Sequence, residues 1–347
     1  MALFDFPLPP ERIAQQPAAD RESARLLVLD RASGAIVAHT QVRALPDSLG
    51  RGDLLVVNNT RVFPARLLGR RDPSGGAVEC LLIRRVDPGR WEALMHPGQK
   101  LHPGARVVFE RDGRQLCAEV LEQHFYGRRT VRLWSDVGED VDAVVDAIGH
   151  VPLPPYIHRP DETPDRERYQ TVYARTRGSV AAPTAGLHLT QGIFDRLADG
   201  GVERTEVTLH VGYGTFKPVR TEKVEDHQVD PETFDVSPEA ASAINAATAG
   251  GRRVVAVGTT TTRVLETLGE RGDGQVAAGS GSSDLFVRPG HRFRVVGGLL
   301  TNFHLPRSSL LMLVCAFAGR EAVLEAYRDA VGLGYRFYSY GDAMLIL

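Results

Sequence analysis

The sequence predicts an α/β protein in which a discontinuous α/β domain (residues 1–66 and 151–347) carries an inserted small β-barrel domain (residues 67–150). Three observations lead to this prediction. Short β-type runs separated by tight turns fill the stretch between Gly69 and Trp134, and a Pro-rich segment, VPLPPYIHRP, follows at residues 151–160. Beyond that segment, helix-like and strand-like stretches alternate, which is typical of α/β domains.

The first part of the chain predicts three strands of the α/β domain. Residues 26–30 and 35–39 are β-type runs joined by a Ser33-Gly34 turn, a pattern that predicts a hairpin. Residues 54–57 form a further apolar run rich in leucine and valine, which predicts a buried strand.

The stretch assigned to the inserted domain alternates short strands with turns. Turn signals such as Asp87-Pro88-Gly89 and Asp112-Gly113 separate runs rich in β-branched and aromatic residues. Several short strands at regular spacing are typical of a small barrel. We expect strands at residues 78–83, 91–95, 106–109, 115–121 and 130–133, followed by an amphipathic helix at residues 139–148.

The second half of the chain predicts helices and strands in alternation. The run RVVAVG at residues 253–258 predicts a buried strand that leads directly into a helix at residues 259–269. Residues 269–283 are rich in Gly and Ser and are expected to form a mobile loop. The other expected elements are helices at residues 190–198, 238–249 and 310–318 and a strand at residues 202–211.

Composition and length are those of an ordinary globular chain. The 347 residues are 43% hydrophobic and 24% charged, with a net charge of −2, which argues against nucleic-acid binding through bulk charge alone. The longest apolar run, residues 310–318, is far shorter than the ~20 residues of a membrane-spanning helix. The N-terminus lacks the pattern of a secretory signal, and the three cysteines are too scattered for a disulfide framework or a zinc site. We therefore expect a cytoplasmic monomer with no membrane contact and no bound metal.

One stretch of the chain is locally basic. Residues 61–132 contain 14 Lys and Arg against 8 Asp and Glu. Such a charge excess predicts a surface that meets the phosphates of a nucleic acid. Arginines that merely solvate the outer faces of strands would give the same count, and the sequence alone does not separate the two interpretations.

The junction GTTTTR at residues 258–263 is a candidate anion-binding site. A strand that runs directly into a helix presents unpaired N–H groups at the helix N-terminus, where the helix dipole also favours an anion. The segment lacks the lysine of a P-loop and the spacing of the GxGxxG dinucleotide fingerprint. Simple helix capping by threonine is the alternative.

Two further sets of residues are candidates for binding and catalysis. The loop after the strand at residues 202–211 contains Gly212 and Gly214, and loops at strand ends often hold binding residues. His188, His210 and His304 lie beside loop-forming residues, and each is a candidate for proton transfer near neutral pH. A structural hydrogen bond is the alternative for each histidine. No metal-ligand spacing and no GxSxG elbow of a serine hydrolase is present in the sequence.

Eight segments of the sequence resemble one known family. In chain order they are NNTRVFPARLLG (58–69), VPLPPYIHR (151–159), DRERYQTVYA (165–174), GSVAAPTAGLHLT (178–190), VTLHVGYGTFKPV (207–219), VAVGTTTTRVLE (255–266), TNFHLPRSSLLMLVCAFAG (301–319) and YRFYSYGDAMLI (335–346). Together they strongly resemble the S-adenosylmethionine:tRNA ribosyltransferase-isomerases.

The resemblance implies an enzyme of queuosine biosynthesis. Members of this family transfer and isomerise the ribosyl group of S-adenosylmethionine onto an aminomethyl-deazaguanine at the tRNA wobble position. The products are epoxyqueuosine-tRNA, adenine and methionine. The resemblance implies that S-adenosylmethionine is a co-substrate, that tRNA is the partner, and that no metal or redox cofactor takes part. It also implies an α/β domain with an inserted β-barrel, in agreement with the strand pattern.

The implied chemistry assigns roles to the candidate residues. The sulfonium of the donor acidifies its neighbouring 5′ carbon, so the reaction needs a base and a dry site. The three histidines are the candidates for the base, with His304 favoured, and Asp284 or Glu232 would face the sulfonium. The residues expected to bind the substrates are Thr184, Gly186, Gly212, Gly214, Thr215, Gly258, Thr259, Thr260, Asp284 and Asn302. The residues expected to contact tRNA are Arg61, Arg66, Arg128 and Arg129, with Phe125 and Tyr126 as stacking groups.

Three positions depart from the family pattern. Asp230 stands where a second histidine is usual, Leu189 stands where phenylalanine is usual, and Gly297 stands where an aspartate is common. Two other classes of protein remain as alternatives. One is a non-catalytic tRNA-binding protein that uses the barrel alone. The other is an S-adenosylmethionine-dependent RNA methyltransferase, although VVAVGTTTT lacks the second glycine of the usual methyltransferase loop.

Overall fold

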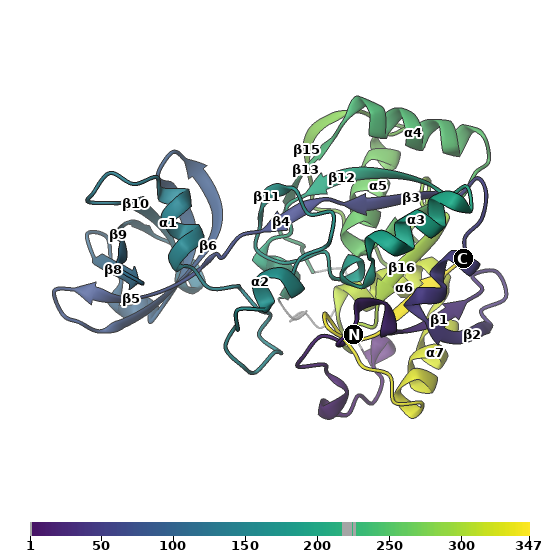
Figure 1. The fold of residues 1–347 in the computed structure, drawn as a ribbon, viewed down its shortest axis with the longest axis horizontal. Helices are drawn as coiled ribbons and strands as arrows, with labels where there is room; N and C mark the ends of the chain where they lie inside the picture. The colour runs from purple at the N-terminus through teal and green to yellow at the C-terminus, as the bar shows by residue number, and fades with distance from the viewer. Residues whose placement is uncertain (1, 217–223, 225–226) are drawn as a thin grey trace.

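A computed structural model describes residues 2–216, 224 and 227–347 of the protein. Figure 1 shows a β-barrel on one side and a larger α/β body on the other, with both chain ends in the α/β body. The predicted fold class, an α/β domain with an inserted barrel, is confirmed.

The α/β body is organised around a mixed sheet that has nine strands in the described part of the chain. The central strands β12, β3, β14 and β16 run parallel, whereas β15, β13 and β2 pair antiparallel at the edges. The order across the sheet is β15 (Gly279–Ser283), β13 (Glu232–Val236), β12 (Glu203–Leu209), β3 (Leu54–Asn58), β14 (Val254–Val257), β16 (Gly298–Asn302), β17 (Ala343–Ile346), β1 (Arg25–Leu29) and β2 (Ile36–Gln41).

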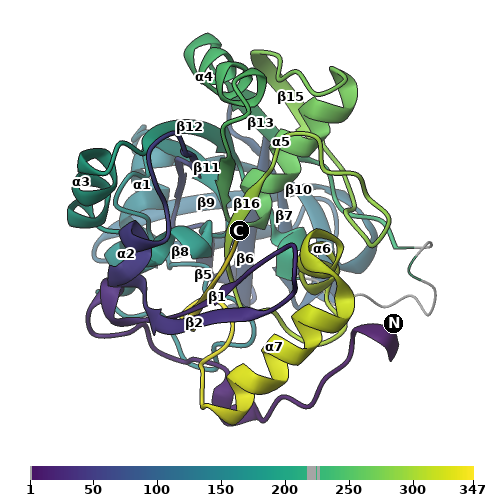
Figure 2. The ribbon, with the colours of Figure 1, turned by 90° about the vertical axis from the view of Figure 1, so that its right-hand side faces the viewer.

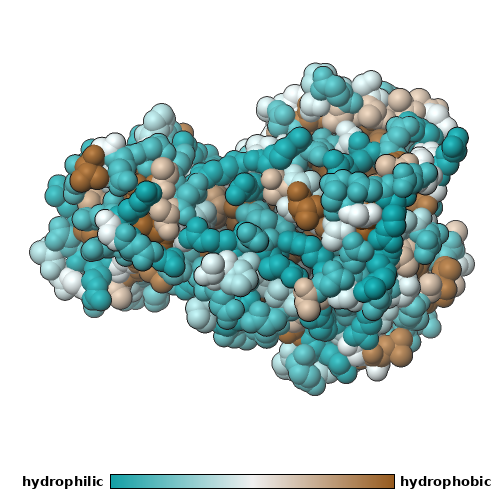
Figure 3. All heavy atoms as spheres, viewed as in Figure 1, coloured by the Kyte–Doolittle hydropathy of each residue, from teal (hydrophilic) through white to brown (hydrophobic). Residues whose placement is uncertain are grey.

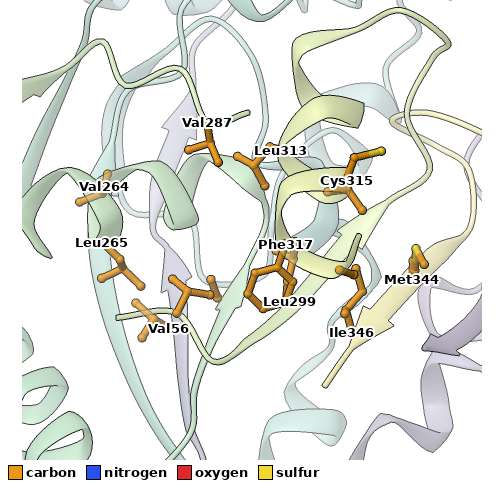
Figure 4. Close-up of a cluster of buried hydrophobic side chains, with 14 of the residues drawn as sticks. Val56, Val264, Leu265, Val287, Leu299, Leu313, Cys315, Phe317, Met344 and Ile346 are labelled. Atoms are coloured by element: carbon orange, nitrogen blue, oxygen red, sulfur yellow. The ribbon is translucent and has the colours of Figure 1, made fainter. Parts of the chain in front are cut away.

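Helices cover both faces of this sheet, and strand β3 shows why. Its leucines and valines alternate in direction, so that Leu54 and Val56 join one core cluster and Leu55 and Val57 join another. Figure 4 shows the first cluster, with Val56 beside residues of α5 and α6, and Figure 2 shows α3 on the other side. The helices are α3 (Gln191–Asp199), α4 (Pro238–Ala249), α5 (Thr259–Arg271), α6 (Ser309–Ala318) and α7 (Arg320–Gly332).

The barrel is closed and antiparallel throughout. Helix α1 (Val141–Ile148) completes its core with Val144 and Val145. Strand β5 was not among the expected strands, because its sequence RLLGRRD buries little apart from Leu67. Around the barrel the strands are β10 (Arg128–Trp134), β7 (Arg90–His96), β6 (Ala77–Asp87), β5 (Arg66–Asp72), β8 (Arg106–Arg111) and β9 (Arg114–Gln123).

A short two-stranded ribbon lies between the two parts of the molecule. Strand β4 (Thr60–Val62) leads out to the barrel and pairs in parallel with β11 (Thr176–Ser179), which follows the return of the chain. Figure 1 shows this ribbon and the short helix α2 (Asp165–Arg168) where the barrel meets the α/β body. Residues on the ribbon can therefore contribute to sites on either part.

One expected loop is partly a strand. The Gly/Ser-rich stretch at residues 269–283 was predicted to be a loop, but its end forms β15, which pairs with β13. Gly281 explains the pairing, because a Cβ there would lie 2.6 Å from the ring of Phe234 on the neighbouring strand. Tertiary packing therefore overrides the weak strand preference of glycine and serine.

The surface is mixed in character. Figure 3 shows a mainly hydrophilic face with scattered hydrophobic residues. In the described part of the chain, no helix combines the length and the apolarity needed to span a bilayer.

Candidate active site

A polar pocket lies at the carboxyl ends of β14 and β16, next to the N-terminus of α5. In open α/β sheets the carboxyl ends of parallel strands are the usual place for a ligand. The pocket is narrow, with a volume of about 50 Å³. Its polar and aromatic lining residues are Tyr156, Thr184, Thr259, Thr260, Thr301, Asn302, His304, Tyr338 and Ser339, with Gly258 at its base.

The N-terminus of α5 has the features of an anion site. The N-cap is Gly258, which has no side chain to cap the helix, and the first turn holds no acidic residue. Thr261 and Thr262 direct their hydroxyls back to the carbonyl oxygens of Val257 (2.7 Å) and Gly258 (3.1 Å). Within the described residues, the buried Oγ1 of Thr260 has no hydrogen-bond partner. The alternative of simple threonine capping is therefore wrong, and the first N–H groups remain available for a ligand.

Asn302 is held in a fixed orientation at the end of β16. Its Oδ1 accepts a hydrogen bond from Oγ1 of Thr184 (2.9 Å), and its Nδ2 donates to Nε2 of His188 (3.1 Å). His188 lies behind Asn302, outside the residues that line the pocket. Burial lowers the pKa of His188 to about 4. The neutral imidazole therefore holds Asn302 in position, and His188 does not itself line the polar pocket.

His304 is the predicted histidine that lines the polar pocket. Its Nε2 lies 2.9 Å from Oγ1 of Thr301, and its backbone N–H donates to the hydroxyl of Tyr327 (3.2 Å). Burial lowers the pKa of His304 to about 3, so the imidazole is neutral near pH 7. A neutral imidazole can form hydrogen bonds with a ligand, but the lowered pKa makes it a weak base, so a role of His304 in proton transfer stays a prediction.

His210 lies apart from the other two histidines. Its Nδ1 is 2.9 Å from Oγ1 of Thr60, and its ring packs against Gly178, where a Cβ would lie 2.6 Å from the ring. Burial lowers its pKa. His210 lines a second cavity, and the three histidines therefore do not form one catalytic cluster.

This second cavity is a wide cleft between the barrel and the α/β body, with a volume of about 920 Å³. Gly212, Gly214 and Arg128 line it, and Val211 lines both the cleft and the polar pocket. Thr215 belongs to the adjoining turn η8 (Tyr213–Phe216). A ligand in the polar pocket would therefore lie beside the space that opens toward the barrel.

The two carboxylates predicted to face the sulfonium lie outside the polar pocket. The carboxylate of Glu232 is buried, where it pairs with Arg263 and accepts a hydrogen bond from the backbone N–H of Gly212 (2.9 Å). Its charge is thus compensated within the protein. Asp284 is exposed and lines neither cavity. Glu232 lines the interdomain cleft beside the polar pocket, and its role toward the sulfonium stays a prediction.

Several of the predicted glycines have structural reasons of their own. A Cβ at Gly186 would lie 1.9 Å from the hydroxyl oxygen of Tyr173, so this glycine permits packing and does not line the polar pocket. Gly258 has φ +91°, a conformation that L side chains rarely adopt. A Cβ at Gly214 would lie 2.7 Å from Oδ2 of Asp230 in the cleft.

The four predicted tRNA-binding arginines differ in availability. Arg129 is buried and donates to four carbonyl oxygens of the barrel, those of Gly98, Leu101, His124 and Arg128. It supports the barrel and is not exposed to a phosphate, so the prediction that Arg129 contacts tRNA is wrong. Arg66 pairs with Glu79 through two bonds of 2.8 and 3.0 Å. Arg128 bridges Glu92 (2.9 Å) and Asp230 (3.3 Å) in the cleft, whereas Arg61 is exposed.

Three arginines that the sequence analysis missed lie close to Arg61. A groove of about 460 Å³ beside the ribbon β4–β11 is lined by four arginines, Arg61 from β4 and Arg166, Arg175 and Arg177 from the returning chain. Phe63 and Arg177 line both this groove and the interdomain cleft. A motif pattern could not reveal the cluster, because residues 61 and 166–177 are distant in the chain and meet in the fold, through the parallel pairing of the ribbon and the hydrogen bonds of Gln170 to Val62.

Aromatic residues also occupy positions of interest. Phe125 and Tyr126, the predicted stacking groups, are 86% and 95% exposed at the turn before β10, which leaves their rings free to contact a base. In the polar pocket Tyr338 has φ +75°, which is rare for an aromatic residue and common at functional sites. Its ring forms an edge-to-face pair with Tyr156 at 3.8 Å between centroids. Sequence reasoning did not single out either tyrosine.

The fold and the site define a mixed α/β enzyme with a barrel insert, whose polar pocket at the strand ends adjoins a wide interdomain cleft. Residues 1–346 match the family described as queuosine biosynthesis protein, and the chain belongs to this family. The predicted family and the predicted enzyme class, S-adenosylmethionine:tRNA ribosyltransferase-isomerase, are thereby confirmed over the two alternative classes.

Relatives with this name match over nearly the whole chain. The chain is 53% identical to the S-adenosylmethionine:tRNA ribosyltransferase-isomerase of Symbiobacterium thermophilum, covering 99% of this chain and 98% of that protein. It is 52% identical to the protein of the same name from Heliobacterium modesticaldum, covering 100% and 99%. The crystal structure of S-adenosylmethionine tRNA ribosyltransferase from Thermotoga maritima shares 36% identity at a TM-score of 0.55, covering 99% of this chain and 100% of that one.

Proposed function

We propose that the protein transfers and isomerises the ribosyl group of S-adenosylmethionine onto the aminomethyl-deazaguanine at the tRNA wobble position. In this proposal S-adenosylmethionine binds in the polar pocket and the wobble nucleotide enters the interdomain cleft. One observation carries the assignment. The N-terminus of α5, with the unpartnered hydroxyl of Thr260 among the described residues, lies in a pocket that shares Val211 with the cleft.

The methionine carboxylate of S-adenosylmethionine is the anion that this helix N-terminus suits. The N–H groups of Thr259 and Thr260 and the hydroxyl of Thr260 are donors for it, and the helix dipole adds to the attraction. The pocket volume of about 50 Å³ is too small for the whole molecule, so the walls must separate or the ligand must extend past Val211 toward the cleft. Either route brings the ribose close to the tRNA base.

The reaction begins with removal of a proton from the 5′ carbon beside the sulfonium. His304 lines the pocket and is our candidate for this step. Adenine then leaves with the electron pair of its glycosidic bond and takes up a proton, and the amine of the deazaguanine forms a C–N bond to the ribosyl carbon and gives up a proton. Ring rearrangement then breaks the C–S bond and releases methionine. We infer that Asn302, which Thr184 and His188 hold in a fixed orientation, hydrogen-bonds the ribosyl group or the departing base.

The remaining expectations form part of the same proposal. The enzyme would act in the cytoplasm as a monomer, with S-adenosylmethionine as a co-substrate and without a metal or redox cofactor. Activity that is unchanged by a chelator and by size-exclusion purification of the monomer would support these points.

The decisive experiment incubates the purified protein with S-adenosylmethionine and tRNA that carries the aminomethyl-deazaguanine. The expected products are free adenine, methionine and a tRNA nucleoside with the mass of epoxyqueuosine. Formation of S-adenosylhomocysteine with methylated tRNA would instead indicate a methyltransferase. tRNA binding without any release of adenine would overturn the proposal in favour of a non-catalytic binding protein.

A further inference from the structure

The groove lined by Arg61, Arg166, Arg175 and Arg177, hereafter the arginine groove, is not explained by the pocket or the cleft. It lies where the ribbon β4–β11 and α2 join the barrel to the α/β body (Figure 1). These arginines come from segments more than 100 residues apart in the chain, and the parallel pairing of the ribbon places Arg61 directly beside Arg177. Like charges on paired neighbours destabilise a sheet, and within the described residues Arg177 has carboxylate partners in Asp142 and Asp146 whereas Arg61 has none.

Two of the four arginines keep an uncompensated charge. Arg166 donates to the carbonyl oxygens of Asp146 (2.9 Å) and Gly149 (2.7 Å), which fix its guanidinium group without neutralising it. Arg61 is exposed on β4, and within the described residues it has no ion pair. An Arg with a rigid fork and no carboxylate partner is suited to a phosphate.

The other charges of the groove are largely balanced within the protein. Arg177 pairs with Asp146 (2.9 Å), and its guanidinium group lies 4.6 Å from the centre of the Phe63 ring. Asp165 is buried and holds Arg159 through bonds of 2.6 and 2.9 Å, so its negative charge does not oppose a ligand in the groove. The net character of the arginine groove is therefore cationic.

The position of the arginine groove identifies the anion. Phe63 and Arg177 are shared with the interdomain cleft, so the groove continues directly from the place where we put the wobble nucleotide. An enzyme that works on a nucleotide within an RNA chain also meets the phosphates on either side of it. We propose that the arginine groove binds backbone phosphates of the tRNA that flank the wobble nucleotide, with Arg61 and Arg166 as the main contacts. This proposal rests on the proposed function, which supplies tRNA as the substrate.

Salt dependence of tRNA binding tests the proposal quantitatively. We expect Arg61→Gln and Arg166→Gln each to reduce the slope of log affinity against log salt by about 0.7 to 0.9, because each removes one phosphate contact. Binding of tRNA that carries the aminomethyl-deazaguanine would be measured by fluorescence anisotropy at KCl concentrations from about 50 to about 300 mM. Arg61→Lys, which keeps the charge, should restore most of the slope. The KM for tRNA should rise in both glutamine variants while the KM for S-adenosylmethionine stays unchanged.

Arg111→Gln is the matched control, since it removes one exposed positive charge from the basic stretch at the end of β8, outside the arginine groove. Its slope should equal that of the wild type. Equal slopes for wild type, Arg61→Gln and Arg166→Gln would overturn the proposal. A slope in Arg111→Gln that is reduced as much as in the two groove variants would also overturn it, because it would indicate diffuse attraction by the whole barrel. Thermal melting checks that Arg166→Gln stays folded. Because Arg61 is exposed, Arg61→Gln still tests the proposal if Arg166→Gln does not fold. Failure of the proposed function would differ from these outcomes, because the wild type itself would then release no adenine.

Discussion

Substitution of His304 by glutamine tests its assignment as the proton-transfer group. Glutamine can keep the contact with Oγ1 of Thr301, and the bond to the hydroxyl of Tyr327 survives because it comes from the backbone N–H of residue 304. The fold should therefore persist while the imidazole is lost. Removal of a general base typically lowers turnover by about 10²-fold or more, and we expect that loss in kcat with little change in binding of S-adenosylmethionine.

The buried position of His304 also fixes the expected pH dependence. With a pKa of about 3, roughly one imidazole in 10⁴ is protonated at pH 7, so His304 should add no step to the kcat profile near pH 6.5. The assay follows adenine release from pH 5.5 to 9, with His102→Gln as control, because His102 is exposed on the barrel. The assignment is refuted if His304→Gln melts at a lower temperature but keeps nearly wild-type kcat. A step near pH 6.5 that disappears in the variant would refute the burial argument.

Four further outcomes follow from the geometry. Thr260→Val should raise the KM for S-adenosylmethionine about 10-fold or more and leave that for tRNA unchanged, since it removes a donor to a charged group. Tyr338→Gly, which relieves the left-handed backbone but removes the ring, should weaken binding of S-adenosylmethionine at least several-fold by calorimetry, and Tyr338→Phe should restore it. Arg129→Leu should cost about 3 kcal/mol or more in urea unfolding without changing the salt slope for tRNA, because four carbonyls lose their donor. The pKa of His188 is about 4 in the folded protein and about 6.5 in the unfolded chain, so the unfolded chain binds the proton more readily between these values. The free energy of unfolding should therefore fall by about 1.4 kcal/mol for each pH unit as the pH drops from 6.5 to 4. This fall should be smaller in His188→Asn.

The sequence predicted the fold where local pattern and burial agree. Strand β3, with every residue buried, and the barrel strand β7, with alternating burial, both fall in expected segments. Strand β5 was missed because it is mostly polar and is held by neighbours on both sides. Strand β15 was missed because its glycines and serines favour a loop until Phe234 on β13 covers them. In both cases the deciding contacts are non-local.

The sequence allowed us to predict several residues of the site but not how they are arranged in space. The GTTTTR junction was identified from the rule that helix N-termini attract anions, and the structure places it in the polar pocket with His304. The spacing of the histidines along the chain could not show that His188 lies behind Asn302 or that His210 belongs to the cleft. Arg129 shows the same limit, since a count of charges does not distinguish a buried guanidinium from an exposed one.

The departure from the family pattern at Asp230 can now be placed physically. Its carboxylate lies 3.3 Å from Arg128 of the barrel, which also contacts Glu92, so the three charges connect the α/β body to the barrel across the cleft. A histidine at this position would be neutral for most molecules at pH 7 and would not neutralise Arg128 in the same way. Asp230 therefore reduces the positive charge of the cleft wall at Arg128. Because Asp230 lines the cleft and not the polar pocket, we expect the substitution to affect how tRNA is received, and the chemistry on S-adenosylmethionine to be unaltered. The other two departures fit this view, since Leu189 is buried in the core beneath α3 and Gly297 precedes β16 at the end opposite Asn302.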